Sequence, residues 1–328
     1  MIRDRNRDVP DERINCPGRC SMAVKTGFTG TPALPSIDFD ECSGCGLCAR
    51  VCKSETLAMV EGQVRVDPDS ALGCIGCGQC MMVCPVGCLT VEGRDVSPRD
   101  LISVPGPDRR ATPEQLEALL FSRRSIREYD EREISRETID KIVNMASSAP
   151  MGIPPSDVEI LIFSGREKVQ AFADDVIQSV IKSRRYINRF TLPLMRPFIG
   201  REACDFMQSF VIPAFELIPR LRKQGIDWLF YNAPLAMLFH SSPYADPQDS
   251  VVAATYAMIA GHSLGLGSCM IGLVCPVIKY DRKLKMKWGI PLRNQFGIVV
   301  IFGYPDVEYQ WAIRRRFRNV VFAGETDC

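Results

Sequence analysis

This chain has few histidines and a net charge close to zero. Only two of its 328 residues are histidine, His240 and His262, and both lie in apolar runs, where we expect hydrogen-bonded core residues. No general acid is apparent, and no catalytic side chain is predicted. The formal net charge of +1 gives no sign of a nucleic-acid or membrane-surface partner.

Two sequence signals are also missing. No Gly-x-Gly-x-x-Gly element follows an expected strand, so a built-in dinucleotide-binding domain is not predicted. No positively charged, apolar, cleavable leader is found, and fifteen cysteines favour a reducing compartment. We therefore expect a cytoplasmic protein, with an anaerobe as the host.

A long uncharged stretch does not change this expectation. Residues 250–278 contain no Asp, Glu, Lys or Arg and are long enough to span a bilayer. They also contain His262, the turn around Gly265 and Pro276. We predict a buried helix, a tight turn and an apolar loop there, and no membrane association.

Two cysteine runs are the most informative feature that is present. Each run places four cysteines within eleven residues, with two-residue gaps and then a three-residue gap. This spacing is typical of a chain wrapped around one iron-sulfur cube whose fourth cysteine reaches a second cube. Disulfide and zinc frameworks are the alternatives, but zinc sites favour CxxC pairs separated by a longer finger. The runs predict electron transfer.

The two runs resemble those of bacterial two-cluster ferredoxins. The resemblance implies that one 4Fe-4S cluster is held by Cys42, Cys45, Cys48 and Cys84, and the other by Cys74, Cys77, Cys80 and Cys52. Lys53 stands where the motif usually has proline. Cys88 has no role in the motif and is interpreted as a small buried residue.

Length and composition predict further domains. A chain of 328 residues with 46% hydrophobic content exceeds what a ferredoxin needs. We expect an N-terminal arm at 1–36, which includes Cys16 and Cys20, and a ferredoxin-like domain at 37–92. A proline-rich linker at 93–112 and a second domain at 113–328 complete the prediction. Within the first domain, residues 56–60 and 88–91 are predicted as the paired strands of an approximate internal repeat.

The second domain alternates helical and strand patterns. Thr112-Pro113-Glu114-Gln115 predicts a helix start, with Leu116, Leu119 and Leu120 on its buried face. Further helices are expected from residue 135 to about 149, over 166–181 and over 251–264, with strands at 158–163, 235–239 and 298–302. This alternation implies an α/β or α+β layer structure.

Residues 122–127, Ser-Arg-Arg-Ser-Ile-Arg, carry three guanidiniums and two hydroxyls. Arginine offers planar, bidentate donors that suit phosphate, and serine adds a short hydrogen bond. An arginine-rich helix end is more often a solvated, dipole-complementing surface. Residues elsewhere in the chain decide between these interpretations.

Residues 113–320 resemble the nitroreductase family of flavoproteins. The resemblance rests on the 122–127 motif, the loop 148–155, the segment 265–272, Gly303-Tyr304-Pro305 and the late arginines 314–316. It implies an α+β fold, with a nitroreductase-like three-layer FMN domain after the ferredoxin-like domain. The whole chain is similar to the ferredoxin-nitroreductase fusion proteins of anaerobes.

The resemblance also implies specific FMN contacts. Phosphate or ribityl groups would be bound by Arg123, Arg124, Ser125, Arg127, Arg314 and Arg316. The flavin ring would be lined by Pro150, Met151, Gly152, Met270, Ile271 and Gly272, with Asn232 as a candidate hydrogen-bonding residue. Family flavins lie at a dimer interface, so a homodimer is implied. This chain has Ile153-Pro154-Pro155 where many members have a polar residue.

The combination predicts an oxidoreductase. Clusters pass one electron and hydride chemistry needs two, so a flavin would join the two processes. We expect electrons from an external donor such as reduced ferredoxin and a small nitro, quinone or enone acceptor. Direct use of NAD(P)H stays open. The alternative is a non-catalytic relay or redox sensor that acts on a protein partner.

Overall fold

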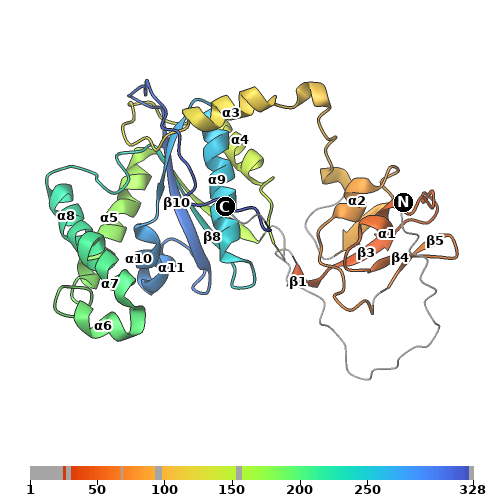
Figure 1. Cartoon of the computed structure of the whole chain (residues 1–328), viewed down its shortest axis with the longest axis horizontal. Coiled ribbons are helices and arrows are strands. Elements are labelled where there is room, and N and C mark those ends of the chain that lie inside the picture. The colour runs from red at the N-terminus through yellow and green to blue at the C-terminus, as the bar shows by residue number, and fades with distance from the viewer. Residues whose placement is uncertain (1–24, 27–30, 68, 93–97, 153–156, 325–328) are drawn as a thin grey trace. The chain divides into compact units, whose positions relative to one another are not determined.

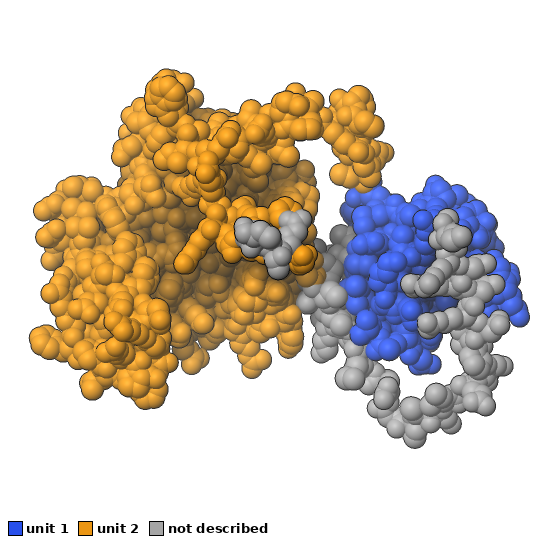
Figure 2. Space-filling view, viewed as in Figure 1, with its two compact units in different colours: residues 1–101 blue, residues 102–328 orange. Residues whose placement is uncertain are grey.

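The computed structural model describes residues 25–26, 31–67, 69–92, 98–152 and 157–324. It divides into two compact units, Met1–Leu101 and Ile102–Cys328, which are coloured separately in Figure 2. Cys16, Cys20 and residues 153–155, which carried sequence-based predictions, lie outside the described residues. No helix in the described part is long and apolar enough to cross a membrane.

The first unit is a repeat of two short helices and two small antiparallel sheets. After the strand pair β1 (Lys25–Thr26) and β2 (Thr31–Pro32) come α1 (Leu47–Val51) and α2 (Gln79–Val83). Strand β3 (Leu34–Ile37) pairs with β6 (Leu89–Glu92), and β4 (Leu57–Val60) pairs with β5 (Gln63–Val66). The predicted repeat strands, β4 and β6, are therefore each paired, but not with one another. β3 also begins inside the stretch expected to be an arm.

Both helices begin in the same way. Gly46 and Gly78 cap them with left-handed backbone, each with φ of 72°. This conformation favours glycine, because a side chain there would clash with its own backbone. A Cβ on Gly46 would also lie 3.3 Å from Sδ of Met59. The two glycines thereby fix the turn that follows the second cysteine of each run.

The second unit is built on a four-stranded antiparallel sheet. The strand order is β7 (Val158–Ser164), β8 (Leu235–Ser241), β10 (Gln295–Gly303) and β9 (Gly267–Ile271). Helices α4 (Arg136–Ala146) and α9 (Pro247–Ser263) cover one face. Helices α5 (Arg166–Ser183), α8 (Ile212–Lys223), α10 (Val274–Tyr280) and α11 (Arg282–Lys287) cover the other (Figure 1). The domain is thus α+β with three layers, as predicted.

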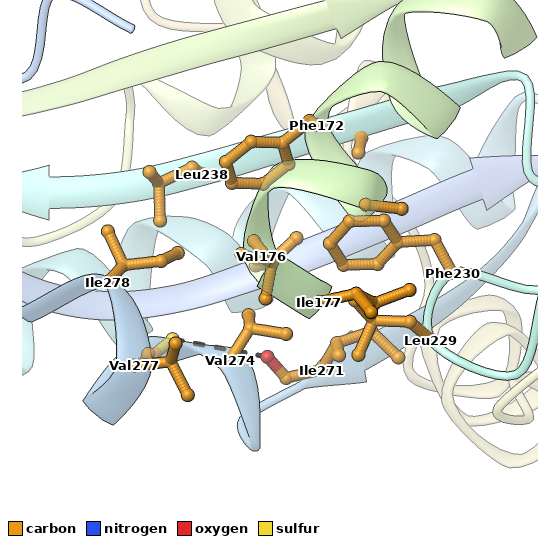
Figure 3. Close-up of a cluster of buried hydrophobic side chains, with 14 of the residues drawn as sticks. Phe172, Val176, Ile177, Leu229, Phe230, Leu238, Ile271, Val274, Val277 and Ile278 are labelled. Atoms are coloured by element: carbon orange, nitrogen blue, oxygen red, sulfur yellow. Dashed lines mark hydrogen bonds between the residues drawn. The ribbon is translucent and has the colours of Figure 1, made fainter. Parts of the chain in front are cut away.

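Side chains that alternate along the central strands contribute to the hydrophobic cores on both faces of the sheet. In β8, Leu235, Met237 and Phe239 face α4 and α9, while Ala236 and Leu238 face α5 and α10. Figure 3 shows Phe172 and Val176 of α5 packed over Leu238. The rings of Phe163 and Phe172 stack at 4.1 Å. Because the sheet is buried on both faces, it forms a rigid support for the segments at its edges.

Several predicted elements differ in extent. The uncharged stretch 250–278 forms α9, β9 and α10, where a loop was expected after the turn, because its apolar residues also fit a buried strand. Between α5 and α8 lie α6 (Leu192–Ile199), α7 (Arg201–Phe206) and a π-helical turn, Met207–Val211.

Helix α3 (Pro113–Ser122) has the predicted capping box between Thr112 and Gln115. The prediction that Leu116, Leu119 and Leu120 form a buried face is wrong for a single copy of the chain. No residue of α3 is buried, and Leu116 and Leu120 are each almost half exposed. Of the three leucines only Leu119 is partly buried, and the other two face outward. Short 3-10 turns at Pro98–Asp100 and Pro107–Arg109 occupy part of the predicted linker.

Candidate redox site

The cysteines of the first unit gather in two groups. One hollow is lined by Cys42, Cys45, Cys48, Cys84 and Cys88. This set contains all four ligands that the ferredoxin resemblance assigned to one cluster. Cys84 of this group comes from the second run, which is what the reaching-across arrangement predicts for the fourth ligand.

The second group forms around Cys80. Burial raises the pKa of the Cys80 thiol to about 12, and the nearby charges of Cys74, Cys77 and Cys52 add to this effect. Cys52 therefore lies with the second run rather than with its own. The two groups match the predicted exchange of the fourth ligands.

The donor set fits two iron-sulfur clusters. In the described part of the chain, no three His, Cys, Asp or Glu side chains converge closely enough to hold a single metal ion. In a cube each thiolate binds its own iron, so four ligands need not converge on one point. Gly44 and Gly76 have left-handed backbone, and the Gly76 amide points at Cys74 Sγ with N–S distance 3.4 Å. Such amide hydrogen bonds favour the negatively charged sulfur.

Cys88 does not behave as the small buried residue that was expected. It lines the first hollow and its Sγ lies 3.5 Å from Sγ of Cys84. The sequence motif has no position for a fifth thiol, so only the folded chain brings Cys88 to the ligands.

A second candidate site begins where α3 ends. Residues 123–129 run extended along the edge of the sheet: Ser125 bridges Ser268 of β9, and the Ile126 amide donates to the Ser268 carbonyl at 3.1 Å. Extended backbone sends alternate side chains to opposite sides. Ile126 is buried against Gly267, while Arg123, Ser125 and Arg127 share the other side.

These three side chains converge on Cys269. Burial raises the pKa of the Cys269 thiol, while Arg127, Ser125 and Arg123 each act to lower it. The Arg127 guanidinium lies 5.7 Å from the ring centre of Tyr231. The segment therefore concentrates two cations and a hydroxyl at one place.

Among the described residues, no carboxylate forms a salt bridge with Arg123, Arg124 or Arg127. Burial lowers the pKa of Arg123, and the neighbouring charges of Arg124 and Arg315 lower it further. In the described part of the chain, the salt bridges use other arginines: 132, 136, 166, 201 and 222. The Ser268 hydroxyl is buried without a hydrogen-bond partner. A bound phosphate would relieve the repulsion between guanidiniums, so the residues present fit the phosphate of FMN.

A cavity of about 400 Å³ opens beside this cluster. Its lining is Leu120, Phe121, Arg123, Arg124, Ser125, Tyr309, Ile313 and Arg315. Arg124 belongs to this cavity, although its guanidinium also donates to the Arg123 carbonyl at 2.6 Å. The volume lies within the range of small-molecule and cofactor sites.

The late basic residues are placed differently from the prediction. All three arginines are exposed, but only Arg315 lines the cavity and acts on Arg123. Alternate residues of an extended tail face opposite ways, so a run of three arginines cannot bring all three to one site. No sequence pattern distinguishes the middle arginine from its two neighbours.

The ring-lining candidates come from two places. Met270 and Ile271 follow Ser268 on β9, and Gly272 comes directly after the last residue of that strand, so these three are contiguous with the arginine cluster. In the other segment, Pro150 is exposed and Met151 packs on the core that includes α9. The Gly152 amide donates to the buried Asp249 carboxylate at 2.9 Å. This bond anchors the loop to the start of α9.

Asn232 is engaged elsewhere. Its side-chain oxygen accepts from Gln170 of α5 at 2.7 Å, and its backbone is left-handed with φ of 53°. The neighbouring Tyr231 faces Arg127 instead. Tyr231, Tyr129 and Cys269 are thus residues near the arginines that sequence reasoning missed, because no motif marks them.

Both histidines are hydrogen-bonded. His240 is buried, and its Nδ1 lies 3.0 Å from the amide nitrogen of Asn294. His262 Nε2 lies 2.8 Å from the Ser122 hydroxyl. Burial lowers the pKa of each ring. The prediction of satisfied core histidines is confirmed for His240, while His262 is only half-buried.

Comparison with known proteins identifies both units. Residues 41–88 match the model of a 4Fe-4S dicluster domain, and residues 120–304, more than half of the chain, match the nitroreductase family model. A protein of Archaeoglobus fulgidus assigned as an NADH dehydrogenase/NAD(P)H nitroreductase is 26% identical over 191 residues, which cover 58% of this chain and 85% of that protein.

Solved structures of low identity were also found. An FMN-bound nitroreductase from Bacteroides fragilis is 18% identical to this chain, with a TM-score of 0.42. The match covers 65% of this chain and 98% of that protein. One from Desulfitobacterium hafniense is 17% identical, with coverages of 65% and 100% and a TM-score of 0.46. The family assignment rests on the family model. The chain belongs to the nitroreductase family and carries a 4Fe-4S dicluster domain ahead of the nitroreductase domain.

Proposed function

We propose that this chain is an FMN-dependent oxidoreductase that passes electrons from an external donor through two 4Fe-4S clusters to FMN and reduces a small organic acceptor. The observation that carries the proposal is the arginine cluster without counter-charges, in the same chain as two separate groups of four cysteines. FMN, when bound, would exchange single electrons for the two-electron reduction of a substrate.

The residues of the second unit would hold FMN as follows. Arg123, Ser125 and Arg127 would bind the phosphate, with Arg124 and Arg315 closing the same cavity. Met270 and Ile271 of β9 and Gly272, which follows that strand, would face the ring, together with Met151 and Gly152. We propose no catalytic side chain, because protons can come from solvent.

The acceptor is proposed to be a nitro, quinone or enone compound. The helical segment between α5 and α8 exposes Tyr186, Phe190, Leu194 and Phe198, the last by 89%. Aromatic and apolar groups of this kind would favour a planar, electron-poor molecule if the segment covers the flavin. Deleting residues 186–206 should then change the preference among acceptors while FMN content stays the same; an unchanged preference would rule out the lid.

We further propose a homodimer with FMN at the interface. The second copy would cover two apolar surfaces: the outer face of α3 and the C-terminal tail, where Trp311, Ile313 and Phe317 are each more than three-quarters exposed. Both surfaces border the arginine-lined cavity through Leu120, Phe121 and Ile313. Exposed apolar area of this extent is typical of an obligate interface.

A cytoplasmic location and a reduced ferredoxin donor are part of the proposal. Cluster thiolates need reducing conditions to stay intact. The relative's name mentions NAD(P)H. We therefore propose to compare the turnover rate with reduced ferredoxin and with NAD(P)H. We expect the faster rate with ferredoxin, because a one-electron donor would deliver its electrons through the clusters.

The experiment is the iron, sulfide and flavin content of anaerobically purified protein, followed by donor and acceptor assays. The proposal expects about eight iron atoms and one FMN per chain, because each cube holds four irons. Iron without flavin would support the relay or redox-sensing alternative. Zinc in place of iron would remove the electron path altogether.

A further inference from the structure

The two cluster sites are related by the internal repeat, but their surroundings differ. In each half a helix of five residues ends at the cysteine that ligates the other cluster, Cys52 or Cys84. The residue three positions later is left-handed in both: Glu55 with φ of 58° and Gly87 with φ of 69°. β4 and β6 then begin at the same offset. The backbone therefore makes Ser54 equivalent to Val86, and Thr56 equivalent to Cys88.

A chain of three hydroxyls leads to Cys52. Its Sγ lies 3.5 Å from Oγ of Ser54, which lies 2.9 Å from Oγ1 of Thr56, and that oxygen lies 3.0 Å from Oγ of Ser70. Ser54 is 8% exposed and Thr56 1%. Buried hydroxyls are costly unless their hydrogen bonds are made, so this chain is a fixed part of the fold.

Ligation fixes the direction of these bonds. A cysteine thiolate bound to iron can only accept a hydrogen bond, so Ser54 must donate to Cys52. The oxygen of Ser54 then accepts from Thr56, and that of Thr56 accepts from Ser70. Bonds that point the same way along a chain polarise one another and strengthen the last one.

The equivalent position beside Cys84 has no hydroxyl. Val86 is apolar and half exposed, so the donors to Cys84 are of other kinds: the Cys88 thiol, a weak donor 3.5 Å from Cys84 Sγ, and the backbone amides of residues 86–88. The group around Cys80 also receives the Gly76 amide on Cys74. Hydrogen bonds to ligand sulfurs stabilise the extra negative charge that arrives on reduction.

We propose that the Ser54–Thr56–Ser70 hydroxyl chain raises the reduction potential of the cluster that includes Cys52. Transfer of an electron from the external one-electron donor to this cluster would then be more favourable than without the hydroxyl chain, with no bond made or broken. This inference rests on the cluster assignment in the proposed function. The role is one of tuning, since none of the three hydroxyls is itself a ligand.

The test is a redox titration of full-length, anaerobically purified protein, followed by electron paramagnetic resonance. Cys45→Ser and Cys77→Ser, which each alter one ligand set, assign the two signals. Ser54→Ala should make reduction of the Cys52 cluster about tenfold less favourable, a decrease of about 59 mV for one electron. Thr56→Val should shift it in the same direction by less. Val86→Ala, the same kind of truncation at the equivalent position, should move neither potential.

The outcomes separate this inference from the proposed function. Wild-type protein without about eight irons per chain would contradict the clusters themselves. Eight irons in Ser54→Ala with an unchanged Cys52-cluster potential, or with both potentials shifted equally, would overturn the hydroxyl chain. If Ser54→Ala loses iron, the wild-type protein decides: the iron-sulfur stretching bands of the Cys52 cluster should shift rapidly in D₂O, and no shift would overturn the proposal.

Discussion

At the residue scale, the arginines near the end of α3 combine high charge with poor compensation. Arg123 is half-buried, close to Arg124 and Arg315, and none of the three forms a salt bridge in the described residues. Uncompensated cations destabilise a folded chain unless an anion binds. The phosphate of a cofactor would therefore stabilise the fold as well as anchor the ligand.

Arg315→Ala should weaken FMN binding more than Arg314→Ala. A hydrogen bond to a charged group contributes about 1.5–3 kcal/mol, so about a tenfold to hundredfold loss of affinity is expected for Arg315 or Arg127. FMN fluorescence quenching during titration of the flavin-free protein measures it. Arg136→Ala, on an exposed arginine paired with Asp140, is the control. Equal losses for Arg314 and Arg315 would contradict the structure.

His240 should make stability depend on pH. Burial, with help from Lys285, lowers its pKa below the usual 6.5, against the opposing charge of Glu159. The unfolded chain then binds this proton at a higher pH than the folded chain does. The stabilisation is complete above about pH 6.5 and is lost as pH falls through the lower, folded pKa.

Urea unfolding between pH 5 and 7, followed by tryptophan fluorescence, measures this effect. All three tryptophans, 228, 288 and 311, lie in the second unit. His240→Gln should reduce the slope of stability against pH, by at most about 1.4 kcal/mol per pH unit. His262, whose pKa is also lowered, supplies the slope that remains. Parallel profiles for the wild type and the variant would show that His240 does not titrate in this range.

At the element scale, strand β9 positions the phosphate segment through one glycine. A Cβ on Gly267 would lie 2.7 Å from Cβ of Ile126, and Ile126 is buried on the segment that carries the arginines. Contact this close cannot form without moving one of the two strands. The packing of an apolar residue therefore determines where the cations lie.

Gly267→Ala should lower both the melting temperature and FMN affinity. Overpacking of this kind typically costs about 1–3 kcal/mol, and the displaced segment carries Arg123 and Arg127 with it. Thermal unfolding and FMN titration measure the two effects. Adding Ile126→Ala should recover part of both, since it removes Cγ1 and Cγ2, two of the three Ile126 atoms that the new Cβ would meet within 3 Å. If Gly267→Ala leaves FMN affinity intact, the segment does not depend on this contact.

Sequence patterns predicted those helices and strands whose formation depends on neighbouring residues. The capping box of α3, the apolar spacing of α4 and the alternation of β8 each follow from neighbouring residues. β9 escaped prediction because residues 250–278 contain no charge to mark its faces. The choice of Arg315, and the placement of Cys88, Tyr231 and Cys269, depend on contacts between distant segments, which no local pattern encodes.

At the scale of the whole molecule, the C-terminal tail exposes apolar side chains to an extent that a single copy of the chain does not explain. From Trp311 to Phe322, six large apolar side chains are each at least 65% exposed: 311, 313, 317, 320, 321 and 322. A soluble monomer rarely exposes so much apolar surface in one segment. A second copy would bury it, and the cavity that the tail lines would then be completed by the partner.

The triple variant Trp311→Ser, Phe317→Ser, Phe322→Ser should therefore be monomeric and bind FMN more weakly. Sedimentation velocity gives the mass, and flavin content gives the binding. Replacing Tyr280 and Met286, which are exposed near α10 and α11, by serine is the matched control and should leave the dimer intact. A triple variant with the wild-type mass would place the interface elsewhere.

The small hydrophobic core of the first unit should make the folding of this unit depend on the supply of iron. Among its described residues, the eight buried apolar side chains include Cys48 and Cys80, which are proposed as cluster ligands. A core of this size gives little stability without metal, so the unit should fold only as iron and sulfide are inserted. The nitroreductase domain has its own large core. In iron-starved cells, proteases should therefore trim the chain to a fragment near residues 102–328 that still binds flavin but has lost its route for incoming electrons.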